Sequence, residues 1–94
     1  MNTSFIYILT NIRNGTLYIG VTSNLKKRVY QHKLDMIDGF SQKYKTHILV
    51  YYEVFDSIEL AIQREKQLKE WKRNWKLELI ENKNEDWNDL YDAI

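Results

Sequence analysis

The chain has 94 residues and no cysteine, and its 14 Lys and Arg against 13 Asp and Glu give a net charge of +1. This length suits a single domain over residues 1–94, and the missing cysteines exclude disulfides, thiolate metal sites and a cysteine nucleophile. No apolar run approaches the ~20 residues that cross a bilayer, and no signal peptide is recognisable, so we expect a soluble, cytoplasmic protein without a membrane partner.

The first part of the sequence predicts a β-hairpin followed by a helix. Two apolar runs rich in β-branched and aromatic residues, 5–9 and 17–21, predict strands. Asn14-Gly15 is a turn signal between them. The polar residues 22–24 can cap a helix, which we expect over about 24–37.

We expect a mixed loop over residues 40–47 and a strand over 48–55. Three helical segments should follow, over 58–68 or beyond, about 71–82, and 87–94. Ser57 can cap the first of these helices. The order β-β-α-β-α-α predicts an α+β fold, in which helices pack on a small three-stranded antiparallel sheet.

Charge is uneven along the chain. Residues 1–76 hold 13 Lys and Arg against 7 Asp and Glu, whereas residues 77–94 hold one Lys against six acidic residues. A mildly basic body is compatible with phosphate contacts. It is also typical of a solvated helix surface followed by an acidic terminus.

Three ionisable residues occupy positions at which the helical periodicity predicts apolar side chains. His32 falls within the apolar stripe of the helix expected over 24–37, and Arg28 lies on its edge. Glu65 falls in the middle of the stripe of the next long helix. A half-buried charge is costly unless it is paired or liganded. Arg28 could instead snorkel, His32 could be a satisfied core histidine, and Glu65 could pair with Arg28 or Lys69.

Tyr7 and Tyr18 share a face of the predicted hairpin if its loop has an even number of residues. A tight turn at Asn14-Gly15 would set Tyr18 opposite Asn11, about 13 Å from Tyr7 along the strand. A wider loop would set Tyr7 directly opposite Tyr18, with ~5 Å between them. Chemistry that uses both hydroxyls needs the wider loop, whereas either ring could also be an ordinary core residue.

Two tripeptides resemble the signature of the GIY-YIG endonuclease superfamily. Tyr7-Ile8-Leu9 and Tyr18-Ile19-Gly20 look like its paired motifs, with Ile6 where the family has Gly. The resemblance covers about residues 5–91. It is closest to small stand-alone members related to the nuclease domain of nucleotide-excision repair endonucleases.

Three further residues match this family in order. Arg28 resembles the characteristic arginine of its first helix, His32 follows one turn later, and Glu65 resembles its single metal-binding carboxylate. The resemblance implies a metal-dependent endonuclease that hydrolyses DNA phosphodiester bonds, with DNA repair or recombination as its setting. It also implies one divalent cation, Mg²⁺ or Mn²⁺, and no organic cofactor.

The resemblance assigns roles to five residues. Glu65 would hold the cation together with waters and a phosphate oxygen. Arg28 would bind the scissile phosphate. Tyr7 would act as general base toward the attacking water, with His32 taking its proton, and Tyr18 would orient the water or phosphate. The alternative, in which Tyr18 is the base, stays open.

Four residues are candidates for DNA contacts. Lys26 is the residue nearest to a lysine that some family members use, and Lys43 and Lys45 lie in the mixed loop. The family often carries a late asparagine in its site, and we favour Asn84 among several candidates.

Two other functions compete with a nuclease. A module of the same fold could bind nucleic acid without turnover, through the 40–47 loop and the basic stretch 64–76. Alternatively, Trp71, Trp75 and Trp87 could form an exposed surface for a protein partner or a homo-oligomer. Packing in the core is the favoured interpretation of these tryptophans, because a short chain needs large rings there.

Overall fold

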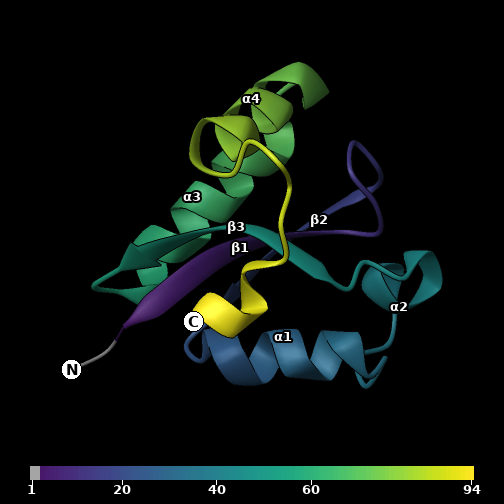
Figure 1. The fold of residues 1–94 in the computed structure, drawn as a ribbon. Coiled ribbons are helices and arrows are strands. Elements are labelled where there is room, and N and C mark those ends of the chain that lie inside the picture. The colour runs from purple at the N-terminus through teal and green to yellow at the C-terminus, as the bar shows by residue number, and fades with distance from the viewer. Residues whose placement is uncertain (1–2) are drawn as a thin grey trace.

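The computed structural model describes residues 3–94, which form a three-stranded sheet covered on both faces (Figure 1). In chain order the elements are β1 (Ser4–Thr10), β2 (Leu17–Thr22), α1 (Leu25–Lys33), α2 (Phe40–Tyr44), β3 (Ile48–Phe55), α3 (Ile58–Glu70), α4 (Arg73–Lys83) and a final 3-10 turn, η1 (Leu90–Ala93). The predicted α+β class and the antiparallel sheet are confirmed.

Strand β1 is the centre of the sheet, whose order is β2-β1-β3 with both pairs antiparallel. Every residue from Ile6 to Thr10 is buried. This explains why β1 reads as a continuous apolar run, since a strand covered on both faces need not alternate. A bulge in the β1–β3 ladder pairs Ile8 with Tyr51 and Leu9 with Leu49, which leaves Val50 as the extra residue.

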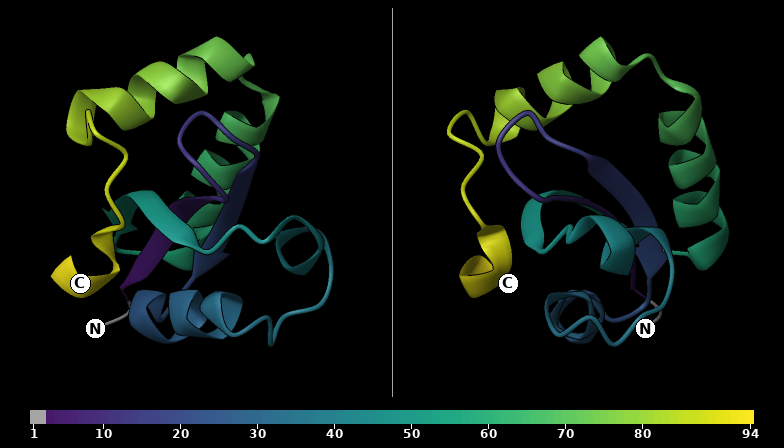
Figure 2. Two further views of the ribbon diagram at one scale, coloured as in Figure 1. Left: turned by 45° about the vertical axis from the view of Figure 1, so that its right-hand side comes forward. Right: turned by 90° about the vertical axis from the view of Figure 1, so that its right-hand side faces the viewer.

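The two faces of the sheet carry separate cores. Helices α3 and α4 pack on one face, where Ile6, Ile8 and Ile80 belong to one buried cluster. Helix α1 covers the other face, where Tyr7 and Val29 belong to the second cluster, with the C-terminal segment packed against it. Figure 2 shows this arrangement, with α1 on one side of the sheet and α3 and α4 on the other. Tyr7 therefore points toward α1.

Helix α1 is shorter than the sequence predicts. It ends at Lys33 because the next turn closes in a Schellman motif, with Asp35 in the left-handed region at φ 54°. The amides of Asp35 and Met36 donate to the carbonyls of His32 and Gln31. Met36, which continues the helical period in the sequence, lies outside the helix and is exposed.

Two other predicted segments differ in detail. The expected loop 40–47 contains the short helix α2, which a pattern of five residues could not reveal. The expected final helix over 87–94 is reduced to the 3-10 turn η1. Trp87 stands outside it at φ 56°, a conformation that a helix cannot contain.

The tryptophans divide between core and surface. Trp87 is buried and Trp71 packs against the core, as predicted, but Trp75 is 50% exposed and the prediction is wrong for it. The chain leaves the helical conformation between α3 and α4, where Trp71 and Lys72 are both extended. This break resets the helical period, so Trp75 does not continue the buried face of α3. In the part of the chain that the structure describes, no helix is long and apolar enough to cross a membrane.

Candidate active site

Tyr7 and Tyr18 lie on the same face of the hairpin, diagonal to one another. Tyr7 pairs with Gly20, and Leu9 pairs with Tyr18. The centroids of the two tyrosine rings are 6.2 Å apart with their planes tilted by 43°. The shared face is as predicted, but both predicted registers are wrong, since Tyr18 faces neither Asn11 nor Tyr7.

The loop between the strands explains this register. It spans the six residues 11–16, because Thr10 and Leu17 are the last pair of the ladder. The Asn11 side chain accepts hydrogen bonds from the amides of Ile12 at 2.8 Å and Thr16 at 3.0 Å. The loop also contains a backbone turn, in which the amide of Gly15 donates to the carbonyl of Ile12 at 2.9 Å and Asn14 has a φ of 58°.

Helix α1 brings His32 against both tyrosines. The Tyr7 hydroxyl and Nε2 of His32 are 2.9 Å apart in a buried hydrogen bond. The ring centroids lie 5.7 Å apart for Tyr7 and His32 and 5.1 Å apart for Tyr18 and His32. Three rings from β1, β2 and α1 therefore pack around one hydroxyl.

His32 is neutral at physiological pH. It is only 2% exposed, and burial, Arg28 and His47 together lower its pKa to about 4. Nδ1 of His32 has no hydrogen-bond partner among the described residues. The imidazole is thus held by a single hydrogen bond, the one with Tyr7.

Arg28 and Glu65 act on the Tyr7 hydroxyl from two helices. Burial raises the pKa of Tyr7 well above its usual range, and Tyr18 and the carboxylate of Glu65 raise it further. The guanidinium of Arg28 opposes them and lowers it. The guanidinium and the carboxylate thus shift the pKa of the hydroxyl in opposite directions, and the hydroxyl is protonated at neutral pH.

Gly20 also belongs to this site, although the pattern of ionisable residues in the sequence does not single it out. A β-carbon at position 20 would stand against the ring and hydroxyl of Tyr7, its cross-strand partner. The Tyr7 side chain therefore lies flat across the backbone of β2. The signal was present in the sequence, since Gly20 closes the second tripeptide.

Glu65 is the carboxylate of this site that could bind a cation. Its side chain is 16% exposed, and Nζ of Lys69 lies 3.4 Å from its Oε2 in an i,i+4 ion pair. Within residues 3–94, no three His, Cys, Asp or Glu side chains gather as a metal cluster. One carboxylate fits a hard cation such as Mg²⁺, which keeps several waters and takes its remaining ligands from a substrate phosphate.

Of the four predicted DNA contacts, Lys26, Lys45 and Asn84 are engaged within the chain, whereas Lys43 is exposed. Nζ of Lys26 donates to the carbonyl of Tyr91 at 2.9 Å and stands 3.8 Å from the centroid of that ring. Lys45 pairs with Asp35 at 2.9 Å. Lys43 is exposed on α2, the helix that carries Phe40.

Asn84 is buried at the end of α4. Its Nδ2 donates to the carbonyls of Val50 at 3.1 Å and Asn88 at 2.8 Å, and its Oδ1 accepts from the amide of Asn88 at 3.0 Å. Every donor of this amide is used. The structure thus places Asn84 as a clamp that ties the C-terminal segment to β3, apart from the tyrosine pair.

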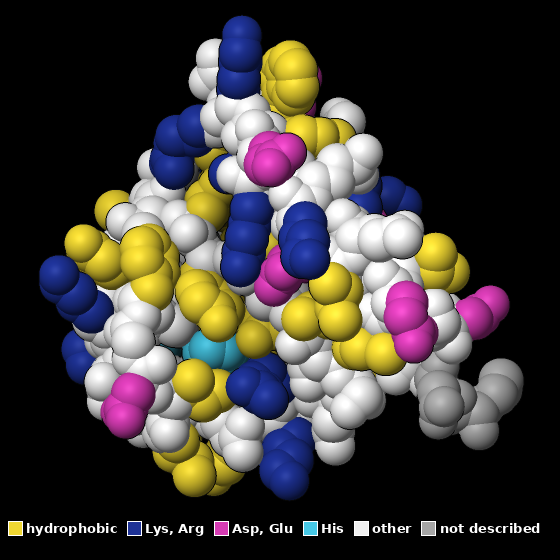
Figure 3. Space-filling model, turned by 180° about the vertical axis from the view of Figure 1, so that it is seen from behind, with side chains coloured by type: hydrophobic (Ala, Val, Ile, Leu, Met, Phe, Trp, Pro, Cys, Tyr) yellow, Lys and Arg dark blue, Asp and Glu magenta, His cyan; other side chains and the backbone are white. Residues whose placement is uncertain are grey.

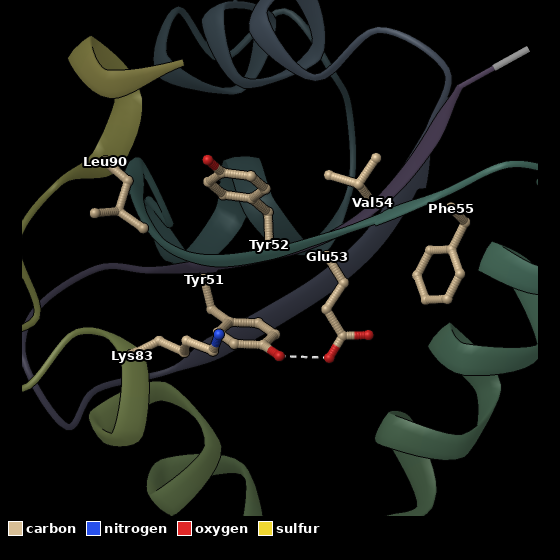
Figure 4. A pocket seen from close by; sticks show the side chains of 7 residues that line it. All are labelled: Tyr51, Tyr52, Glu53, Val54, Phe55, Lys83 and Leu90. Carbon is tan, nitrogen blue, oxygen red and sulfur yellow. Dashed lines mark hydrogen bonds between the residues drawn. The ribbon is translucent and has the colours of Figure 1, made fainter. Parts of the chain in front are cut away.

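A hollow of about 580 Å³ lies along the outer edge of β3 and is separate from these residues. Figure 4 shows its lining, in which Tyr51 and Glu53 point to one side of the strand and Tyr52 to the other. The Glu53 carboxylate accepts a hydrogen bond from the Tyr51 hydroxyl and forms an ion pair with Arg64 at 2.9 Å. Tyr51, Glu53 and Arg64 thus satisfy one another, and Lys83 also lines the hollow.

Residues 3–78 match the family model of the GIY-YIG catalytic domain. The match covers most of the chain and includes the tyrosine pair, Arg28, His32 and Glu65. The chain belongs to the GIY-YIG family, a family of nucleases.

Relatives that share this chain's length carry the name UPF0213 protein. The chain is 36% identical over 85 residues to UPF0213 protein CPE1444 of Clostridium perfringens, with 86% of each chain covered. It is 34% identical over 86 residues to the UPF0213 protein of Syntrophus aciditrophicus, with 90% of this chain and 98% of the relative covered. These names state no activity.

A solved structure agrees with the fold. The solution NMR structure of the UPF0213 protein BH0048 from Bacillus halodurans aligns over 93% of this chain and 92% of that chain, with a TM-score of 0.57 and 24% identity. At this identity the likeness supports the fold alone.

Proposed function

We propose that this chain is a divalent-metal-dependent endonuclease that hydrolyses phosphodiester bonds in DNA. The observation that carries the proposal is the buried hydrogen bond between Tyr7 and the neutral His32, at a hydroxyl whose pKa Arg28 lowers and Glu65 raises, in a chain of a nuclease family. Phosphodiester hydrolysis needs an activated water, stabilisation of the developing phosphorane charge and an in-line geometry. Arg28, Glu65 and the Tyr7–His32 pair each suit one of these needs.

Arg28 binds the scissile phosphate. Its planar guanidinium can donate to two phosphate oxygens at once and stays charged across the physiological range. The same charge lowers the pKa of Tyr7. Arg28 thus stabilises the phosphorane and makes it easier for Tyr7 to give up its proton.

Tyr7 takes the proton of the attacking water. Because its hydroxyl is protonated at rest, it must pass its own proton on as it receives one. Nε2 of His32 is the acceptor within reach, at 2.9 Å. The relay needs the tautomer whose proton is on Nδ1, so that Nε2 offers a lone pair. Tyr18, on the same face, orients the water or the phosphate.

Glu65 holds the divalent cation, Mg²⁺ or Mn²⁺. When bound, the cation supplies positive charge that stabilises the phosphorane and the leaving oxygen. Nζ of Lys69 lies 3.4 Å from the same carboxylate, so the cation would compete with this ammonium for Glu65.

The likeness to nucleotide-excision repair nucleases supports a setting in DNA repair or recombination, with DNA as the partner. A cytoplasmic location is supported by the absence of cysteine, which fits a reducing compartment.

Nicking of supercoiled plasmid in Mg²⁺ or Mn²⁺, with single-stranded DNA in parallel, tests this proposal. Wild type should cleave, and Glu65→Gln should not, because the amide removes the charge that binds the cation. Glu70→Gln, at an exposed position of the same helix, is the matched control and should cleave like wild type. Thermal melting of all three proteins checks that they are folded.

A wild-type protein that binds DNA yet cuts neither substrate with either ion would overturn the proposal. It would favour the nucleic-acid-binding module of the same fold. Equal cleavage by Glu65→Gln and wild type would remove the metal assignment.

A further inference from the structure

Four aromatic rings form a continuous line from the buried centre to the surface. The centroids of Tyr18 and His32 are 5.1 Å apart. Those of Tyr18 and Phe40 are 6.1 Å apart, with the planes within 27° of parallel. Phe40 in turn lies 4.6 Å from Tyr44. His32 at the inner end is buried, whereas Phe40 and Tyr44 at the outer end are 46% and 41% exposed. Helix α2 therefore presents aromatic surface directly beside Tyr18.

Polar contacts hold α2 in this position. The Ser41 and Thr46 hydroxyls, both buried, are hydrogen-bonded at 2.6 Å. Nε2 of Gln42 donates to the carbonyl of Asp35 at 3.1 Å, and the Asp35 carboxylate pairs with His47 at 2.7 Å. The two rings are therefore fixed in place by their own helix while remaining open to solvent.

Cationic side chains border the aromatic pair. Lys69 and Lys76, together with Phe40, line a hollow of about 310 Å³. Nζ of Lys43 lies 5.4 Å from the ring centroid of Tyr44. Figure 3, which views the molecule from behind, shows a recessed histidine with hydrophobic and Lys or Arg side chains around it. Flat rings bordered by ammonium groups suit a ligand that offers an aromatic face and a phosphate together.

We propose that Phe40 and Tyr44 form a stacking platform for an unpaired nucleobase next to the scissile phosphate. A base within a duplex has both faces covered by its neighbours, so only an unpaired or extruded base can lay a face on these rings. The substrate class that follows is single-stranded DNA, or branched DNA with unpaired nucleotides at the cut. This inference rests on the proposed function and deepens it.

A binding experiment that needs no cleavage tests the platform. In a Glu65→Gln background, the affinity for a short thymidine strand is compared with that for an abasic strand of equal length, which keeps the phosphates and lacks the bases. Phe40→Leu and Tyr44→Leu remove one ring each and keep apolar volume. Tyr30→Leu is the matched control, because Tyr30 is an exposed tyrosine of α1.

Phe40→Leu should weaken thymidine-strand binding by about fivefold or more, which is the lower end of the stacking effect per base. The abasic strand should bind wild type and Phe40→Leu equally, and Phe40→Trp should restore thymidine binding. Tyr44→Leu should behave like Phe40→Leu. Tyr30→Leu should leave both affinities unchanged.

Two outcomes would overturn the platform. Equal losses on both strands would show that Phe40 acts through the shape of the site, and unchanged affinities would show that the rings serve another partner, such as a protein. The proposed nuclease function is judged separately, by the plasmid and single-strand cleavage assay. In that assay, Phe40→Leu should lower cleavage of single strands.

Discussion

A β-carbon at position 20 would stand 2.4 Å from the hydroxyl oxygen of Tyr7, so the glycine of β2 sets the position of the tyrosine of β1. We therefore expect Gly20→Ala to displace the Tyr7 ring and break its 2.9 Å hydrogen bond with His32. Cleavage should fall by orders of magnitude, while the free energy of unfolding should fall by about 1–3 kcal/mol, as for overpacked cores. Urea unfolding and the nicking assay measure the two effects.

A double-mutant cycle checks the cause of this effect. Tyr7→Leu removes the hydroxyl and part of the ring, so Gly20→Ala should cost less stability in that background than in wild type. Additive costs would show that the alanine disturbs β2 for a reason unrelated to Tyr7.

The second prediction concerns the Tyr7 hydroxyl itself. Tyr7→Phe keeps the ring and leaves His32 with no hydrogen-bond partner among the described residues. We expect a loss of cleavage by orders of magnitude and a loss of about 1–2 kcal/mol in stability. Tyr51→Phe is the matched control, because Tyr51 is also a buried tyrosine of the sheet whose hydroxyl is hydrogen-bonded. It should lose similar stability and keep cleavage, and a control that also lost cleavage would show that the Tyr7 effect is only structural.

Periodicity predicted the parts of this site that depend on which way a side chain faces. Tyr7 and Tyr18 share a face because the hairpin loop has an even number of residues. His32 is buried because α1 continues its apolar stripe through that position. Both inferences need only local geometry.

The register of the β1–β2 hairpin and the ends of the helices depend on specific contacts, which the periodicity of the sequence does not predict. The hairpin loop combines hydrogen bonds to the Asn11 side chain with a backbone turn from Ile12 to Gly15, and with this six-residue loop Tyr18 faces Leu9. The family resemblance suggested a DNA contact for Asn84. In the structure its amide donates instead to the carbonyls of Val50, 34 residues earlier in the chain, and of Asn88. Such tertiary contacts override a local pattern.

The third prediction is a dependence of stability on pH. The pKa of His32 is lowered from 6.5 to about 4 in the folded chain. Between these values the unfolded chain binds more protons, so stability is lost as pH falls from about 6.5 toward 4, by up to about 3 kcal/mol in total. The lowered pKa values of Asp35 and Glu53 mean that these carboxyls lose their stabilising contribution only at lower pH.

The difference between wild type and His32→Gln isolates this contribution. Urea unfolding from pH 7 to pH 4 should show a steeper loss for wild type than for the variant. Parallel curves for the two proteins would contradict the assignment.

The fourth prediction separates stability from DNA binding at Asn84. Asn84→Ala removes one buried and two partly buried hydrogen bonds and leaves the Val50 and Asn88 groups without this partner, so it should cost about 2–3 kcal/mol. Affinity for DNA, measured well below the melting temperature, should stay at the wild-type value. Asn82→Ala, at an exposed position of α4, should change neither quantity. A lower DNA affinity of folded Asn84→Ala would show that Asn84 contributes to DNA binding.

The last prediction concerns the competition between Lys69 and a metal ion for Glu65. The ammonium lies 3.4 Å from the carboxylate and is half exposed, so the ion pair is weak, of the order of 0.3–0.5 kcal/mol. Lys69→Met removes the competing charge and keeps the aliphatic stem. Direct titration with Mn²⁺ should then give a Kd about twofold lower than wild type, since the cation no longer displaces an ammonium. Lys66→Met, also exposed on α3, should leave the Kd unchanged, whereas equal tightening by both variants would indicate a general effect of net charge. A higher Kd for Mn²⁺ in Lys69→Met would mean that Lys69 assists metal binding at Glu65. Glu65 would then have to be tested as a structural partner of Lys69.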